Sequence, residues 1–294
     1  MNGKTKLAVN FQNKSIFNIS SIFSLGFILA LFLFFSLACS SHLQEAKLYF
    51  SQGQEHLQRY QTSESRISFQ KAKEAAQAGI KKQSLAQLYV IKGLAEVQLE
   101  EWPEAEKSFS LAYSLGFEKG EEWAAEAALY GLAQSLEEFG LTTLALESYS
   151  HLLSRSKFKP VTILAAGRYV QIKLAQILSL PPQERSKNLE LLLEQIRKLL
   201  KQDYHLGYYH YLSSQILSHR GRYQESFEEG VMARELGLPS SEIFRDNDRQ
   251  LIFCYRQLKK ELPPSEWNNF SVLYHRLTNQ WGWRDEETPS WMKR

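Results

Sequence analysis

The chain has 294 residues, of which 44% are hydrophobic and 13% are aromatic, and this suffices for one large or two modest buried cores. Its formal net charge of +3 belongs to the start of the chain, because setting aside Lys4, Lys6 and Lys14 leaves 32 basic residues against 32 acidic ones. This balance argues against nucleic acid or an anionic membrane face as a partner, and the two cysteines, Cys39 and Cys254, exclude a disulfide framework.

The first 38 residues have the layout of a secretory signal peptide. Three lysines precede an uncharged stretch, Ile22–Ala38, which ends in small residues. This stretch is about 17 residues long, which is at the lower limit for a membrane-spanning helix and slightly long for a signal-peptide core. We therefore expect a signal peptide over residues 1–38, although length alone leaves an uncleaved anchor helix open.

The apolar run ends in Leu37-Ala38-Cys39-Ser40, which resembles a bacterial lipobox. In that motif a cysteine follows a small residue and becomes the acylated N-terminus after cleavage. The motif usually has leucine three residues before the cysteine, whereas this chain has Ser36 there, and such loosened motifs look like those of spirochaete lipoproteins. The resemblance implies that Cys39 is lipidated and tethers the chain to a membrane. An uncleaved signal anchor and ordinary secretion are the alternatives.

From Glu45 onward, apolar residues recur at three- and four-residue spacing, which is typical of amphipathic helices, and we expect no β-sheet. Prolines interrupt this pattern between periodic segments, where a missing amide and a fixed φ cost least. The segments between them are about 14 to 20 residues long, which is ordinary for packed helices. The prolines at these breaks are Pro103, Pro160, Pro181, Pro182, Pro239, Pro263 and Pro264.

A pattern of small and aromatic residues recurs along the helical part of the chain. After a first small residue, a second one follows at offset 12, an aromatic residue at offset 16 in three of four copies, and an alanine or leucine at offset 19. Small residues let two antiparallel helices cross closely, and the aromatic ring fills the gap to the next pair. The four sets are Gly53, Ser65, Phe69 and Ala72; Gly93, Ala105, Phe109 and Ala112; Ala133, Ala145, Tyr149 and Leu152; and Ser214, Ser226, Gly230 and Ala233.

This spacing resembles the tetratricopeptide repeat (TPR), and residues 86–116 are the best single copy. The resemblance implies an all-α, right-handed solenoid of about six TPR-like antiparallel helical hairpins. The first small residues of the first three sets lie 40 residues apart and that of the fourth lies 81 further on, whereas the family repeats about every 34 residues, so HEAT-like helical repeats are an alternative. Lys92 and Glu96 stand where the family prefers apolar residues, and Gly230 replaces an aromatic residue.

Two further hairpins are inferred from the 40-residue register. Ala175 stands where the fourth hairpin needs its small residue, and Cys254 stands there in the sixth, with Phe270 and Leu273 at the expected offsets. Cys254 is therefore interpreted as a packing residue rather than a nucleophile. The expected division of the chain is a tether over residues 39–45, a repeat domain over 46–281 and a polar tail over 282–294.

The C-terminal part of the chain is denser in tryptophan than the rest. A terminal hairpin of a solenoid must cover an apolar face that would otherwise contact water. We therefore expect Trp267 and Trp281 to cap the solenoid.

In TPR-like proteins, the first helix of each hairpin lines a concave surface where extended partners bind. Carried over by position, this resemblance places the residues three before, one after and four after each first small residue in the groove. Tyrosines there indicate a protein or peptide partner, because tyrosine gives a large contact area and a hydrogen-bonding tip. The alternative is that these tyrosines pack hairpin against hairpin. The expected partner-binding residues are Tyr130, Gln134, Glu137, Tyr208, Tyr211 and Gln215, and the other groove positions are Phe50, Gln54, Leu57, Val90, Leu94, Val97 and Ser218.

The sequence has no glycine-rich phosphate loop, nucleophile elbow, paired-histidine zinc helix or cysteine pair. His205 and His210 are five residues apart, which does not place them on one helical face, and no cysteines or carboxylates complete a metal site. We therefore expect no enzyme activity, no metal and no cofactor.

These observations predict a lipid-anchored cell-envelope scaffold that binds a protein or peptide through its concave face. The chain resembles repeat-containing lipoproteins that help assemble or stabilise outer-membrane and secretion machinery in Gram-negative bacteria. That resemblance implies a location on the periplasmic side of the outer membrane. The alternative is a structural subunit of a membrane complex, held by an uncleaved N-terminal anchor helix.

Overall fold

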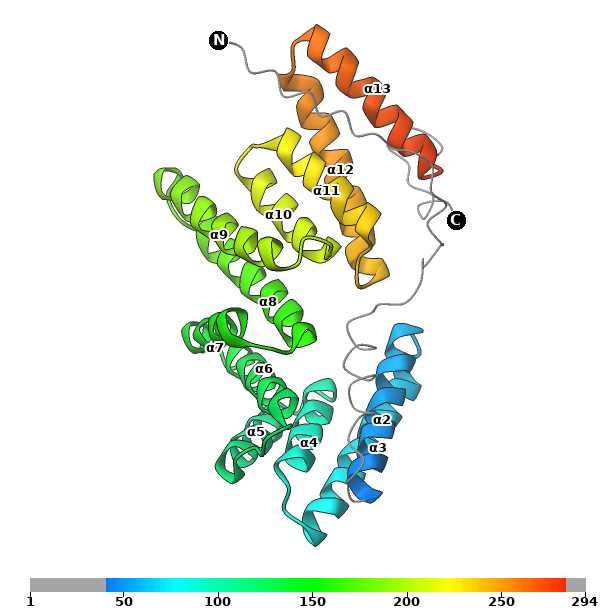
Figure 1. The fold of residues 1–294 in the computed structure, drawn as a ribbon, viewed down its shortest axis with the longest axis vertical. Helices are drawn as coiled ribbons and strands as arrows, with labels where there is room; N and C mark the ends of the chain where they lie inside the picture. Colours follow the sequence, from blue (N-terminus) through cyan, green and yellow to red (C-terminus); the bar gives the residue numbers. More distant parts are fainter. Residues whose placement is uncertain (1–40, 284–294) are drawn as a thin grey trace.

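The computed structural model describes residues 41–283, and all regular structure in this range is α-helical. Twelve helices follow one another with short connections over these residues (Figure 1). The first six are α2 (Ser41–Gln58), α3 (Thr62–Lys82), α4 (Ala86–Gln98), α5 (Trp102–Leu115), α6 (Glu122–Glu138) and α7 (Thr142–Arg155). The other six are α8 (Lys159–Leu178), α9 (Pro182–Gln202), α10 (Gly207–His219), α11 (Tyr223–Leu236), α12 (Ser241–Glu261) and α13 (Pro264–Gln280).

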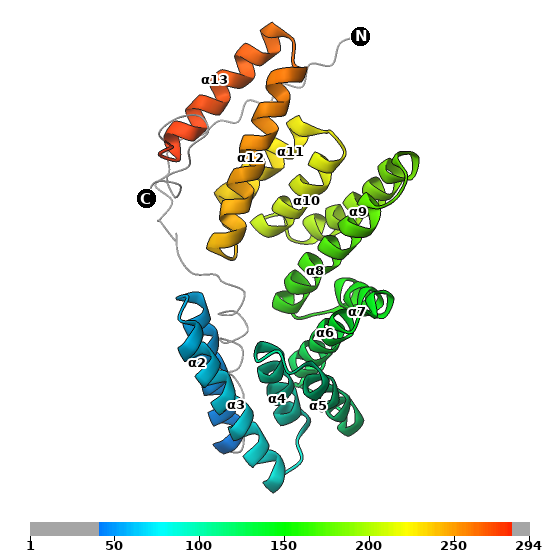
Figure 2. The ribbon, with the colours of Figure 1, turned by 180° about the vertical axis from the view of Figure 1, so that it is seen from behind.

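Consecutive helices pair into six hairpins, from α2–α3 to α12–α13, and each hairpin also contacts the next. The first helices of the hairpins touch one another in succession and form an inner row of α2, α4, α6, α8, α10 and α12. Figures 1 and 2 show that the hairpins follow an arc, with α5, α7 and α9 on its outer side. The chain is an all-α helical-repeat solenoid of TPR-like hairpins, as its sequence predicted.

The helices within a hairpin cross where a small residue faces an aromatic ring. A methyl group added at Gly53 would lie 2.6 Å from the ring of Phe69, and one added at Gly93 would lie 2.7 Å from the ring of Phe109. Both rings are buried. The ring of Phe109 also lies against Gly131 of the next inner helix. The 16-residue offset in the sequence is therefore a contact between two helices, as predicted.

The small residues at offset 12 add hydrogen bonds between the paired helices. Ser65 donates to the carbonyl oxygen of Gly53 over 2.9 Å. Ser214 and Ser226 bond reciprocally, because each hydroxyl donates to the carbonyl oxygen of the other, over 2.7 and 2.8 Å. These hydroxyls are buried, and such bonds satisfy the requirement that buried polar groups have partners.

The prolines set the starts of four helices. Proline occupies the first turn of α5, α8, α9 and α13, at Pro103, Pro160, Pro182 and Pro264. The first amides of a helix have no intrahelical partner, so the missing N–H of proline costs nothing there. At these four prolines, the predicted interruption of the helical pattern is therefore the start of a helix.

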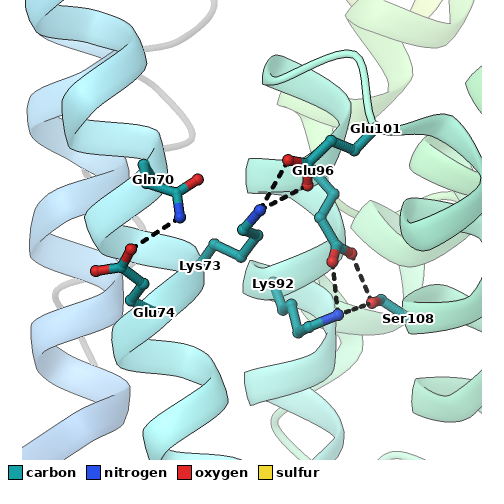
Figure 3. Close-up of polar contacts among 7 residues, drawn as sticks. All are labelled: Gln70, Lys73, Glu74, Lys92, Glu96, Glu101 and Ser108. Carbon is teal, nitrogen blue, oxygen red and sulfur yellow. Dashed lines mark hydrogen bonds and ion pairs between the residues drawn. The ribbon is translucent and has the colours of Figure 1, made fainter.

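The two charged residues that depart from the repeat pattern pair with each other inside the second hairpin (Figure 3). Lys92 donates to Oε1 of Glu96 over 2.6 Å and to the hydroxyl of Ser108 over 2.9 Å. Ser108 donates to Oε2 of Glu96 over 2.6 Å. Beside them, Lys73 of α3 makes an ion pair with Glu101 over 2.7 Å. These buried and half-buried polar groups are tolerated because each one has a partner.

Gly230 replaces the aromatic residue of the fifth hairpin, and side chains of α12 fill the space. A methyl group added at Gly230 would lie 3.0 Å from a methyl carbon of Leu251. Asn247 donates its side-chain amide to the carbonyl oxygen of Gly230 over 2.9 Å. Both side chains are fully buried, so the next hairpin supplies the packing that the ring provides elsewhere.

The fourth and sixth hairpins exist, but one predicted packing residue in each is wrong. Ala175 is exposed, whereas its neighbour Leu174 is buried. Cys254 is buried as expected, but Leu273 is 38% exposed and Tyr274 is fully buried in its place. Ala175 lies on α8 and Leu273 on α13, and in each helix the buried residue is the direct neighbour of the predicted one. The register counted on the first three hairpins is therefore displaced by one residue at these two positions.

An aromatic cluster closes the C-terminal end of the solenoid. The rings of Tyr255 and Tyr274 stack with centroids 3.9 Å apart, and Trp267 lies 5.0 Å from Tyr255. Trp281 lies 5.4 Å from Trp283, which is buried against Tyr274. The expected cap residues Trp267 and Trp281 both belong to this cluster. Trp283, which the sequence placed in a polar tail, belongs to it as well.

The first helix begins at Ser41, inside the stretch 39–45 that was expected to be a tether. Leu43 and Ala46 are buried in the first core cluster, and their burial stabilises this early start. The expected signal peptide, Cys39 and residues 284–294 lie outside the described residues. Among residues 41–283, no helix combines the length and the apolar character needed to cross a membrane.

We expect Gly93→Ala to lower the free energy of unfolding by about 1–2 kcal/mol, because the added methyl group displaces the ring of Phe109 and this outweighs the gain in helix propensity. Urea unfolding followed by circular dichroism measures the change. Glu138→Ala, at an exposed position of α6, is the control and should have little effect. In a Phe109→Leu background the glycine substitution should cost less. An equal cost in both backgrounds would contradict the ring contact.

Candidate functional site

The inner row of helices faces the hollow of the arc, and the two ends of the arc meet. Tyr60, in the turn after α2, is hydrogen-bonded to Ser241, the first residue of α12, which lies 181 positions further along the chain. Figure 1 shows this turn opposite the start of α12. The side chain of Tyr60 is otherwise largely exposed, at 71%. The first and sixth hairpins therefore touch across the hollow.

A cleft of about 170 Å³ lies between the inner helices α2, α4, α6 and α8. Its walls are mostly apolar, three glutamines line it, and no charged residue does so within the described range 41–283. The apolar and aromatic lining residues are Phe50, Leu94, Val97, Ala127, Tyr130, Val161 and Leu164, and the glutamines are Gln54, Gln98 and Gln134.

Six of the residues that line this cleft are groove positions expected from the repeat pattern: Phe50, Gln54, Leu94, Val97, Tyr130 and Gln134. The sequence reasoning missed four others. Gln98 lies one helical turn after Leu94, so the helical period was a sufficient signal for it. Val161 and Leu164 belong to the fourth hairpin, where the repeat register is displaced. Ala127 precedes the first small residue of its hairpin by six positions, outside the offsets considered.

The side-chain amides of the three glutamines in the cleft are not hydrogen-bonded to other residues in the described range. Gln98 is exposed, whereas Gln54 and Gln134 are half-buried. Within residues 41–283, no side-chain hydrogen bond is formed by any of the three. A side-chain amide carries two donor hydrogens and an acceptor oxygen. Each amide is therefore available to pair with a bound molecule.

Glu137, an expected partner-binding residue, is engaged inside the protein. Its carboxylate accepts a hydrogen bond from the hydroxyl of Tyr149 over 3.1 Å and one from Nε of Arg168 over 3.2 Å. A second nitrogen of Arg168 pairs with the other carboxylate oxygen. Burial lowers the pKa of Arg168, but the charge and hydrogen bonds of Glu137 raise it, and the net shift is upward. This ion pair joins α6 to α8.

The predicted tyrosines mainly pack helices together. Tyr130 and Tyr211 are only 8% and 6% exposed. The ring of Tyr130 lies 5.8 Å from that of Tyr149, and Gln215 donates to the hydroxyl of Tyr211 over 2.6 Å. Tyr208 is half-buried and stacks on Tyr211 at 5.9 Å. Most of their surface serves packing, which was the alternative interpretation, and their contact with a partner stays a prediction.

Charged groups act on tyrosines along the inner row of helices. Burial raises the pKa of Tyr211, and Asp246 and Glu242 of α12 raise it further. Burial also raises the pKa of Tyr130, on which Arg168 and Glu137 act in opposite directions. None of these charged residues lines the cleft itself, so among residues 41–283 the lining is best suited to an uncharged ligand.

His210 is a structural histidine, not half of a metal site. Its Nδ1 lies 2.6 Å from a carboxylate oxygen of Glu229, and its Nε2 lies 2.8 Å from the carbonyl oxygen of Tyr204. Both partners are acceptors, so both ring nitrogens donate and the ring is an imidazolium. His205 is exposed, and among residues 41–283 no group of three or more His, Cys, Asp or Glu is placed to hold a metal.

The charge on His210 makes stability depend on pH. Burial lowers the pKa of His210, but the hydrogen bonds to Glu229 and Tyr204 raise it, and the net shift is upward from 6.5. A raised folded-state pKa contributes stability that is full below 6.5 and is lost as pH rises through the folded pKa. The stability difference between the native chain and His210→Asn should therefore shrink on the alkaline side of this window.

Urea unfolding from about pH 6 to pH 9 measures this difference. His205→Asn is the matched control, because its ring is exposed, and it should show no such change. A difference for His210→Asn that stays constant or grows with pH would contradict a charged ring.

The geometry defines an all-α helical-repeat protein with an uncharged cleft on its inner row of helices. No known protein family matches the chain, and no curated protein matches its sequence. Among solved structures, Pseudomonas aeruginosa pilF is 14% identical over 79% of this chain and 99% of its own, with a TM-score of 0.46. YrrB, a TPR protein with an unusual peptide-binding site, is 16% identical over 71% of this chain and 94% of its own, with a TM-score of 0.38. At such TM-scores, the fold assignment rests on the helix contacts described above.

Proposed function

We propose that this protein is a lipid-anchored cell-envelope scaffold that binds a protein or peptide partner through the concave face of its solenoid. The observation that carries the proposal is the cleft between α2, α4, α6 and α8, whose glutamines form no side-chain hydrogen bond and whose lining carries no charge within the described part of the chain. Apolar clefts with a few convergent polar groups are the usual form of binding sites. The arc of inner helices supplies an extended surface around it.

The chemistry of Cys254 supports binding without catalysis. This residue is buried, and its thiol donates to the hydroxyl of Ser226 over 3.2 Å. Burial raises the pKa of the thiol, although the hydrogen bonds to Ser226 and Gln250 oppose the shift. A catalytic cysteine needs the opposite, an accessible thiolate with a lowered pKa.

The membrane anchor is proposed to be an acyl chain on Cys39, at the end of the signal-peptide-like leader. Only Ser40 separates Cys39 from the first helix, which begins at Ser41. An acylated Cys39 would hold the first hairpin close to the membrane surface. The lipobox resemblance supports this anchor, and with it a place on the periplasmic side of the outer membrane of a Gram-negative bacterium, such as a spirochaete.

The second candidate is a structural subunit of a membrane complex, held by an uncleaved anchor helix. The uncharged stretch Ile22–Ala38 favours it, because its length of about 17 residues reaches the lower limit for spanning a bilayer. The two candidates differ in the mature N-terminus, since only the second retains Met1.

Cells grown with a radioactive fatty acid should label the native chain and leave Cys39→Ala unlabelled, because acylation uses that thiol. Cys254→Ala is the matched control and should keep the label, since Cys254 is buried. Equal labelling of Cys39→Ala and the native chain, or no label on either, would refute the lipid anchor. A peptide that contains Met1 in membrane fractions would favour the anchor helix instead.

A photo-reactive amino acid at Gln134 should cross-link the full chain to its partner in cells, because Gln134 lines the cleft. The same group at Tyr208 tests the predicted tyrosine contacts. Glu147, exposed on α7 at the outer side of the arc, is the control position and should give no such product. Binding through the concave face is excluded if neither inner position cross-links, or if Glu147 cross-links equally well.

A further inference from the structure

The uncharged lining of the cleft restricts the chemistry of the segment that enters it, an inference that rests on the proposed function. Of the residues from 41 to 283, no lysine, arginine, aspartate or glutamate lines the cleft. A charged side chain that entered it would lose its water and find no opposite charge, which is strongly unfavourable. The part of the partner that occupies the cleft is therefore uncharged.

The walls of the cleft are suited to one apolar side chain. Phe50, Leu94 and Val161 are 3%, 8% and 0% exposed, so packing within α2, α4 and α8 fixes their positions. Their contact atoms line a space of about 170 Å³, which is the scale of an aliphatic or aromatic side chain. Burial of such a side chain removes apolar surface from water on both partners and favours binding.

The glutamines are suited to a peptide backbone. Gln54, Gln98 and Gln134 come from three successive inner helices, α2, α4 and α6, at the edge of the apolar walls. An extended peptide presents N–H donors and C=O acceptors along its length, and a side-chain amide pairs with both kinds. These amides have no hydrogen-bond partner among residues 41–283, so such pairing breaks no hydrogen bond in this part of the protein.

The contact between Tyr60 and Ser241 favours an extended segment over a folded domain. It joins the turn after α2 to the start of α12, so the first and sixth hairpins touch. A folded partner that entered from this side would have to break this contact, whereas an extended chain can pass beside it.

We propose that the cleft binds an extended, uncharged segment of another protein, which inserts one aliphatic or aromatic side chain between the apolar walls. Gln54, Gln98 and Gln134 form hydrogen bonds with the backbone of that segment. The side chain gives specificity, and the amides hold the backbone whatever its sequence.

The first test selects peptides from a random 12-residue phage library against the full chain in detergent. The expected peptides share an aliphatic or aromatic residue flanked by uncharged residues. Gln134→Glu keeps the shape of the side chain but adds a charge, and selection against it should shift the peptides toward those that contain lysine or arginine. Unchanged preferences would contradict the proposal.

The second test measures the affinity of a selected peptide by fluorescence anisotropy. Gln54→Leu combined with Gln134→Leu should weaken binding about 10- to 30-fold, which is the loss expected for two ordinary hydrogen bonds. Gln176→Leu, at an exposed position of α8 that does not line the cleft, is the matched control and should bind as the native chain does. Circular dichroism confirms that each variant is folded.

The outcomes separate this inference from the proposed function. Charge-rich peptides, or equal binding by the double variant and the native chain, would overturn the inference, even if Gln134 cross-links to a partner in cells. So would a failure to select any peptide, or binding that requires a folded partner, a lipid or a second copy of this chain. Binding through the concave face, as part of the proposed function, is overturned by different results: no cross-link from Gln134 and Tyr208, or equal cross-linking from Glu147.

Discussion

The ring of Phe109 holds two levels of the architecture together. It occupies the space over Gly93, which sets how closely α4 and α5 cross, and it lies against Gly131, which sets how the third hairpin stacks on the second. In the first hairpin, the ring of Phe69 likewise occupies the space over Gly53 and sets how closely α2 and α3 cross. The curvature of the arc and the distance between inner helices follow from such contacts, so the cleft depends on residues that never touch its contents.

The fold was predictable from sequence wherever the contacting small and aromatic residues lie at a constant separation along the chain. Gly53 and Gly93, with the rings 16 residues later, gave the hairpins and their order. The prediction failed at Ala175 on α8 and at Leu273 on α13, because the buried residues Leu174 and Tyr274 lie one position away from the predicted ones. Periodicity reports which residues share a helical face, but helix length and the neighbouring helix decide which of them is buried.

The candidate site was predictable in its location and less so in its chemistry. The repeat pattern placed Gln134 and Tyr130 on the inner row, where both line the cleft. It also favoured tyrosines as the main contacts with a partner, whereas most of the surface of Tyr130 and Tyr211 is buried against other helices. A sequence shows that an amide is polar, but the arrangement of the helices α2 to α13 is needed to show that Gln54 and Gln134 have no hydrogen-bond partner among them.

The hydrogen-bonded network of Lys92, Glu96 and Ser108 restricts which sequence changes related proteins can tolerate. Glu96 is 2% exposed, and its carboxylate accepts hydrogen bonds from Lys92 and Ser108, which are also bonded to each other. The loss of either partner therefore leaves a buried charge or a buried hydrogen-bonding group unmatched. We expect these three positions to change together in evolution, because a substitution at one of them alone destabilises the fold. Proteins descended from this chain should therefore retain all three polar residues or exchange them together for apolar ones, so the mark of this interaction is joint change across three positions.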